Sequence, residues 1–199
     1  MTTPGILPLI LFAGAAAITP GGATMLATAS GAHFGYRRSL PLIAGITASL
    51  ASMAAAAALG LGGVILAVPS LSLVMKLAGS AYLAWLAWQI ARRGPPHRAA
   101  QRATPMRFRT ALWLQWCNPK GWAMTLGAAA SFASLAASPL GLAALLSGLF
   151  AVCAILSLSL WCLGGLLLTR LLRSAAQWHA VNAVLGALII AALLPLWLD

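Results

Sequence analysis

Residues 108–133 read FRTALWLQWCNPKGWAMTLGAAASFA, and this stretch decides the fold class. It is longer than the roughly 20 mostly apolar residues that a helix needs to cross a bilayer. Its charged residues are Arg109 near the start and Lys120 near the middle, where Asn118-Pro119-Lys120 also places a proline. We therefore predict a membrane-spanning helix that is broken close to its centre.

The composition of the whole chain agrees with this assignment. Of its 199 residues, 62% are hydrophobic and 7% are charged, whereas a soluble domain carries about 25% charged residues. The sequence thus predicts an all-α integral membrane protein. Six stretches are long and apolar enough to span, namely 5–30, 39–61, 68–90, 108–133, 140–168 and 177–198.

The scarcity of acidic residues excludes several kinds of catalytic site. Asp199, the last residue, is the only acid in the chain. A pair of catalytic carboxylates, a Ser-His-Asp triad and a carboxylate metal site are therefore excluded, and the cysteines have no metal-binding spacing. We expect no enzymatic activity, no metal and no cofactor.

The arginines predict the orientation in the membrane. All ten lie in alternate connections between the six stretches, and orientation follows the positive charges, which stay in the cytoplasm. The expected topology has both termini outside, and the net charge of +11 then reports on topology and predicts no nucleic-acid partner. Trp85, Trp88 and Trp178 fall near the inner boundary, where an aromatic belt and the interfacial histidine His33 are expected. The arginines are Arg37, Arg38, Arg92, Arg93, Arg98, Arg102, Arg107, Arg109, Arg170 and Arg173.

A basic, proline-interrupted linker divides the chain into two similar halves. We expect a three-helix repeat over 1–91, a cytoplasmic linker over 92–107 and a second three-helix repeat over 108–199. Three spans per half give the halves opposite orientations. Pro20-Gly21-Gly22-Ala23-Thr24-Met25 matches Pro119-Lys120-Gly121-Trp122-Ala123-Met124 at an offset of 99 residues. This pattern is typical of transporters built from inverted repeats with broken helices.

The candidate site lies at these two prolines. Each proline frees the carbonyl one turn earlier, on Ala16 and on Gln115, and a free carbonyl in lipid needs a partner. Lys120 lies 11 residues, about 16 Å, beyond Arg109, close to the bilayer midplane. A lysine there is costly and has no intramembrane acid to pair with. The alternatives are simple proline kinks and a lysine that reaches the inner interface. The predicted substrate-binding residues are Thr19, Pro20, Gly21, Gly22, Gln115, Asn118, Pro119 and Lys120.

Several of these residues resemble a known family. The segments 19–21, 35–38 and 76–83, together with Gly45 and Asn118-Pro119-Lys120, resemble the LysE/RhtB family of bacterial amino-acid exporters in order and spacing. The resemblance implies efflux of amino acids or close derivatives across the inner membrane. Members usually carry Pro-Gly-Pro-Asn in the first span, where this chain reads Pro20-Gly21-Gly22-Ala23. The departure affects the pocket and therefore the choice of substrate.

The predicted function is a secondary exporter of small amino acids or derivatives. The substrate carboxylate would meet Lys120 and a half-helix N-terminus, and Thr19 and Asn118 would donate hydrogen bonds. The expected partners are this small molecule and the lipid bilayer, and a homo-oligomer is left open. Two alternatives are a membrane scaffold and a thiol-redox carrier. The carrier would need paired cysteines, but the position that matches Cys117 in the other half is Ile18.

Overall fold

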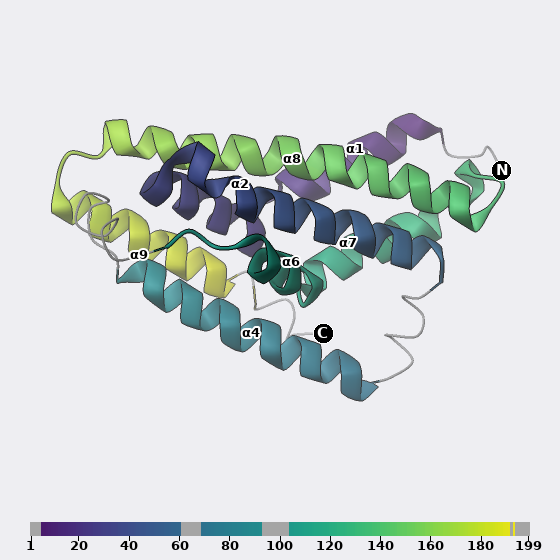
Figure 1. Cartoon of the computed structure of the whole chain (residues 1–199), viewed down its shortest axis with the longest axis horizontal. Helices are drawn as coiled ribbons and strands as arrows, with labels where there is room; N and C mark the ends of the chain where they lie inside the picture. Colours follow the sequence, from purple (N-terminus) through teal and green to yellow (C-terminus); the bar gives the residue numbers. More distant parts are fainter. Residues whose placement is uncertain (1–4, 61–68, 93–103, 192, 194–199) are drawn as a thin grey trace.

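The computed structural model describes residues 5–60, 69–92, 104–191 and 193, and every regular element among them is helical. The helices pack into an elongated bundle (Figure 1). This agrees with the all-α prediction. Most of the predicted linker 92–107 lies outside the described residues. The elements are α1 (Ile6–Ile18), α2 (Gly22–Ala58), α4 (Pro69–Ala91), α6 (Phe108–Trp116), α7 (Pro119–Ser131), the short 3₁₀ helix η1 (Ala133–Leu135), α8 (Pro139–Leu171) and α9 (Ala175–Ala191).

Helix α2 contains two helical segments that fold back on each other at Gly35. The Ser30 and Ser39 hydroxyl oxygens are 2.7 Å apart, although nine residues of straight helix would separate them by about 13 Å. Gly35 has φ 76° and ψ 170°, a conformation that is essentially restricted to glycine. The sequence pattern predicts a connection over 31–38, between the spans 5–30 and 39–61. Instead one glycine makes the reversal, and Arg37 and Arg38 already lie in the returning helix.

The second half of α2 lies beside α8 at the centre of the bundle, and α4 lies beside α9 (Figure 1). Glycines permit the close approach of α2 and α8. A side chain at Gly31 would overlap the Cys162 carbonyl, and one at Gly165 would overlap the Thr28 carbonyl. Small residues at helix contacts are typical of membrane bundles, where close packing drives association.

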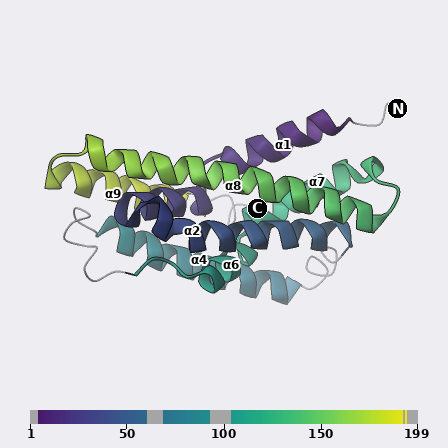
Figure 2. The same ribbon diagram turned by 45° about the horizontal axis from the view of Figure 1, so that its top comes forward.

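The outer surface of the bundle is apolar. Leu7 and Leu11 of α1 are each 63% exposed, and α1 slants away from the other helices toward the N-terminus (Figure 2). Among the described helices, α2 and α8 are long and apolar enough to cross a membrane, while α1 and α9 are shorter apolar helices. An apolar exterior of this kind suits contact with lipid.

The predicted interfacial positions of Trp178 and His33 need correction. Trp85 and Trp88 are exposed, as expected of interface residues, but Trp178 is buried. Trp178 packs against His33, with ring centroids 6.1 Å apart. His33 is itself buried, and its Nε2 lies 3.2 Å from Asn182 Oδ1. The prediction of an interfacial His33 was wrong because the contact between α2 and α9 encloses it.

Candidate functional site

The structure breaks a helix at each of the two predicted prolines. Helix α1 ends at Ile18 and α2 begins at Gly22, with Thr19, Pro20 and Gly21 between them. Helix α6 ends at Trp116, and Pro119 is the first residue of α7, where a missing N–H costs nothing. Asn118 is the N-cap, and its Oδ1 accepts a hydrogen bond from the Lys120 backbone at 3.1 Å.

The two breaks meet at Lys120. Its Nζ donates a hydrogen bond of 2.7 Å to the Thr19 carbonyl, 101 residues away in the sequence. Gly21 provides the space for this contact, because a Cβ there would lie 3.3 Å from both Cδ and Nζ of Lys120. The ammonium group therefore donates a hydrogen bond to a carbonyl that the broken helix leaves without an intrahelical partner.

Side chains of α8 bind two more free carbonyls at the end of α1. Ser157 Oγ donates to the Ala17 carbonyl at 2.8 Å, and Trp161 Nε1 donates to the Ile18 carbonyl at 3.1 Å. Both residues belong to α8, one helical turn apart. Neither residue was among the predicted site residues, although two polar groups at this spacing in an apolar span were a usable signal. On the other side of the break, Thr24 Oγ1 accepts from the Gly21 N–H at 2.8 Å.

The second break is held by two tryptophans. Trp122 Nε1 donates to the Trp116 carbonyl at 2.8 Å, and Trp116 Nε1 donates to Ser52 Oγ at 3.1 Å. The two indoles meet edge to face, with centroids 5.1 Å apart. The carbonyl of Gln115, which the sequence analysis expected to be free, accepts from the Asn118 backbone at 3.0 Å.

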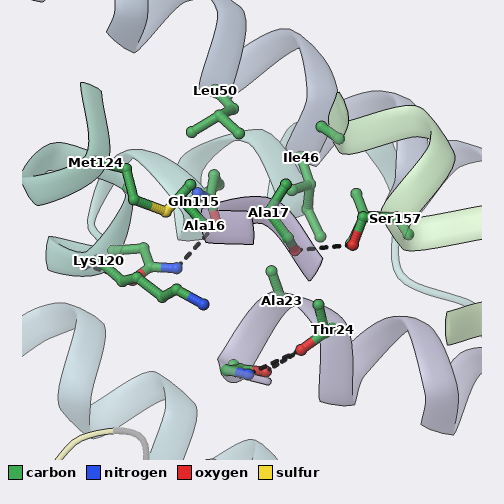
Figure 3. A pocket seen from close by; sticks show the side chains of 16 residues that line it. Ala16, Ala17, Ala23, Thr24, Ile46, Leu50, Gln115, Lys120, Met124 and Ser157 are labelled. Atoms are coloured by element: carbon green, nitrogen blue, oxygen red, sulfur yellow. Dashed lines mark hydrogen bonds between the residues drawn. The ribbon is translucent and has the colours of Figure 1, made fainter. Parts of the chain in front are cut away.

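A small cavity with a mostly apolar lining and a few polar groups lies between the breaks (Figure 3). Its volume of about 40 Å³ has room for no more than a few water molecules. The cavity also touches Ile46 and Ala154, near the middle of the returning half of α2 and of α8. Asn118 Nδ2 donates to Gln115 Oε1 at 3.0 Å within it. Its polar and glycine lining includes Gly21, Gly22, Gln115, Asn118, Lys120 and Ser157.

The structure does not bring all eight predicted residues into this cavity. The side chains of Thr19 and Pro20 are exposed, and Thr19 Oγ1 donates to the Ala15 carbonyl at 2.6 Å. Only the Thr19 carbonyl reaches the site, so the expected hydrogen bond from its hydroxyl to a substrate is not supported. The cause is local, because a threonine at the end of a helix readily bonds the carbonyl one turn back. Pro119 is half-buried and serves to begin α7.

The cysteines do not form a site. Cys117, Cys153 and Cys162 are all free thiols, and Cys117 lies against Gly79 of α4. Among the described residues no group of three His, Cys, Asp or Glu side chains could hold a metal ion.

Comparison with known proteins shows the family to which the chain belongs. A family model described as LysE type translocator matches residues 15–196. The cysteine/O-acetylserine efflux protein of Escherichia coli O139:H28 is 30% identical over 87% of this chain and 88% of its own length. The protein of the same name in Klebsiella pneumoniae is 38% identical, over 52% of this chain and 53% of its own length. No solved structure matches the chain. The chain belongs to the LysE family, whose members are transporters and not enzymes.

Proposed function

We propose that this protein exports a small zwitterionic amino acid or amino-acid derivative across the inner membrane. Relatives named for cysteine and O-acetylserine efflux support this substrate class. Both named compounds are uncharged overall at neutral pH and carry an α-carboxylate. A cationic substrate fits less well, because Asp199 is the only acid in the chain and no acid within the membrane could balance an extra positive charge.

The contact between Lys120 and Thr19 carries the proposal. Lys120 is partly buried, and its ammonium has three protons to donate; one of them reaches the Thr19 carbonyl. The group also lines the cavity, where a carboxylate could accept from the others. A carboxylate would be the natural partner for a cation that lacks an acid within the membrane.

Two helix N-termini border the same cavity. Helix α2 begins at Gly22 and α7 begins at Pro119, and Gly22, Asn118 and Lys120 all line the cavity. The N-terminus of a helix carries a partial positive charge that favours anions. Transporters with discontinuous helices use such ends to hold anionic substrate groups. In this proposal Asn118 and Gln115 supply further hydrogen bonds from α6 and its break.

We further propose that the chain forms two inverted three-helix repeats with both termini outside. The matching breaks support this arrangement, because each divides the first helix of its half. The packing is also consistent with it. The returning half of α2 pairs with α8, and α4 pairs with α9, as second and third helices related by a twofold axis would.

Export from loaded cells tests the role of Lys120. In cells preloaded with radiolabelled O-acetylserine, Lys120→Met should abolish efflux while the protein remains inserted in the membrane. Lys120→Arg should restore only part of the rate, because the planar guanidinium is larger than the ammonium and the cavity is small. Lys76→Met, which removes the only other lysine, is the matched control and should export normally.

The same assay separates the alternatives. A membrane scaffold would keep its assembly role in Lys120→Met, and a thiol-redox carrier would lose activity when the cysteines are replaced. Efflux at the wild-type rate from Lys120→Met would rule out the proposed carboxylate site. Normal efflux after replacement of all three cysteines by alanine would rule out the redox role.

A further inference from the structure

A second and larger cavity lies between the α2 hairpin, α4 and the start of α6. Its volume is about 500 Å³, which falls within the range of small-molecule sites. It extends to Phe34, next to the turn at Gly35, and to Gln89, near the end of α4. This is the end of the bundle that carries Arg37, Arg38 and Arg92. Its described polar lining includes Ser30, Tyr82, Gln89, Thr104, Arg107 and Thr110.

The two cavities are stacked along the same helices. Thr24 lines the small cavity and Leu26 the large one, on the first half of α2. On the returning half, Ile46 lines the small cavity and Leu42 lines the large one, and the two residues lie about 6 Å apart along the helix axis. On α6, Gln115 lines the small cavity and Thr110 the large one. Leu83 packs at the boundary, because a Cβ on Gly22 would lie 3.5 Å from both of its methyl groups.

Arg107 is the one charged side chain among the described residues that line the large cavity. It is exposed and stands at the N-cap of α6. Phe108 packs beside Gly45, ten residues beyond the turn at Gly35, so Arg107 lies about 15 Å deeper in the bundle than that turn. An arginine at such depth is tolerated where it faces a water-filled cavity. It differs in this respect from Arg37 and Arg38, which lie at the turn itself.

We propose that Arg107 forms a first binding site for the substrate carboxylate, from which the substrate passes to Lys120. The inference rests on the proposed export function, and it assigns the large cavity as the entrance. An arginine offers a carboxylate two parallel hydrogen bonds. Tyr82, Gln89 and Thr110 can bind the amino group or a polar side chain. The stacking of the two cavities suggests a route from the large cavity to Lys120 that runs past Leu83.

Thiol labelling tests the charge in the cavity without requiring transport. Thr110→Cys is introduced into a chain whose three native cysteines are changed to alanine. Two impermeant methanethiosulfonates, one with an anionic sulfonate and one with a cationic trimethylammonium, are applied to inside-out and to right-side-out vesicles. Normalised to a free thiol, the anionic reagent should react about tenfold faster than the cationic one. Labelling should occur from the cytoplasmic face, in inside-out vesicles.

Three comparisons make the result specific to a carboxylate at Arg107. Arg107→Gln should remove the preference for the anionic reagent, whereas Arg109→Gln, two residues further along α6, should keep it. O-acetylserine should slow labelling, and its methyl ester, which lacks the carboxylate charge, should not. In transport, Arg107→Gln should raise KM about tenfold with little change in maximum rate, whereas Lys120→Met should lower the maximum rate.

The outcomes separate the two proposals. No labelling from either face, a preference that survives Arg107→Gln, or equal protection by acid and ester would overturn the Arg107 site. Each of these results leaves the Lys120 site standing if Lys120→Met still abolishes efflux. Conversely, normal efflux from Lys120→Met with intact labelling results would remove the Lys120 site and keep the entrance. Labelling only in right-side-out vesicles would contradict the entrance and the proposed orientation together.

Discussion

Individual glycines determine how closely the two central helices approach. Gly31 lies against the Cys162 carbonyl and Gly165 lies against the Thr28 carbonyl, so each helix places a glycine at the backbone of the other. This reciprocal contact occurs in the part of the bundle between the site and the turn at Gly35. Without an appreciable hydrophobic driving force between helices in lipid, such contacts supply much of the association energy.

Gly165→Ala should therefore destabilise the protein. The new methyl group would overlap the Thr28 carbonyl, and overpacking of this kind costs about 1–3 kcal/mol. Gly164→Ala, at the neighbouring position, is the matched control, because nothing lies within 4 Å of its added Cβ. The melting temperature in detergent is measured by size-exclusion chromatography after heating. It should fall for Gly165→Ala only. Equal melting temperatures for the two variants would show that the helices can separate without loss.

Broken helices place their freed carbonyls where other elements must bind them. Helix α8 binds two of those on α1 through Ser157 and Trp161. The Gly21 N–H, which would bond the Ala17 carbonyl in a continuous helix, is instead bonded to Thr24. Ala17 therefore depends on Ser157, and α8 acts as the support for the first break.

Ser157→Ala should weaken this support. Leaving the Ala17 carbonyl without a partner costs about 1–3 kcal/mol, and we expect a lower melting temperature and slower efflux. Ser147→Ala is the control on the same helix. Ser147 Oγ also donates to a backbone carbonyl, on Ala51 at 3.0 Å, but that carbonyl lies inside α2 and has an intrahelical partner. Comparable losses in both variants would mean that the break itself is not what Ser157 stabilises.

The sequence could predict these helices better than their contacts. Apolar length predicted a span over 108–133, and Pro119 predicted the break that separates α6 from α7. The reversal at Gly35 could not be predicted from the sequence. The residues on both sides of it are helical, and the turn is made by a single residue with positive φ. His33 and Trp178 were misplaced for a related reason. Whether a polar residue near a helix end meets water or another helix depends on tertiary packing, which the sequence pattern does not contain.

Arg109 does not mark the end of the bundle, although the predicted depth of Lys120 was counted from it. Helix α6 instead begins beside Gly45, well inside the bundle. Lys120 still lies near mid-length of the bundle because its cavity touches Ile46 and Ala154. Of the linker arginines that the structure describes, Arg92 follows the end of α4, whereas Arg107 lines a cavity.

At the scale of the whole molecule, the arginines predict which end faces the cytoplasm. The turn at Gly35, the end of α4 and the connection between α8 and α9 carry Arg37, Arg92 and Arg173, and they lie at one end of the bundle (Figure 1). The Arg92 guanidinium lies 3.9 Å above the centre of the Trp88 ring, an arrangement suited to an interface. A common end for these charges is what a single cytoplasmic face requires.

Reporter fusions test this orientation. A fluorescent protein that matures only in the cytoplasm should remain dark when fused after Asp199, and a periplasmic phosphatase at the same position should be active. The matched control is the same pair of reporters fused after Arg98, in the predicted linker, where fluorescence should be bright and phosphatase activity low. The two fusions share the first three helices, so a difference between them reports only on the second half of the chain. Bright fluorescence after Asp199 would place the arginine-rich end outside, and substrate would then enter the large cavity from the opposite face.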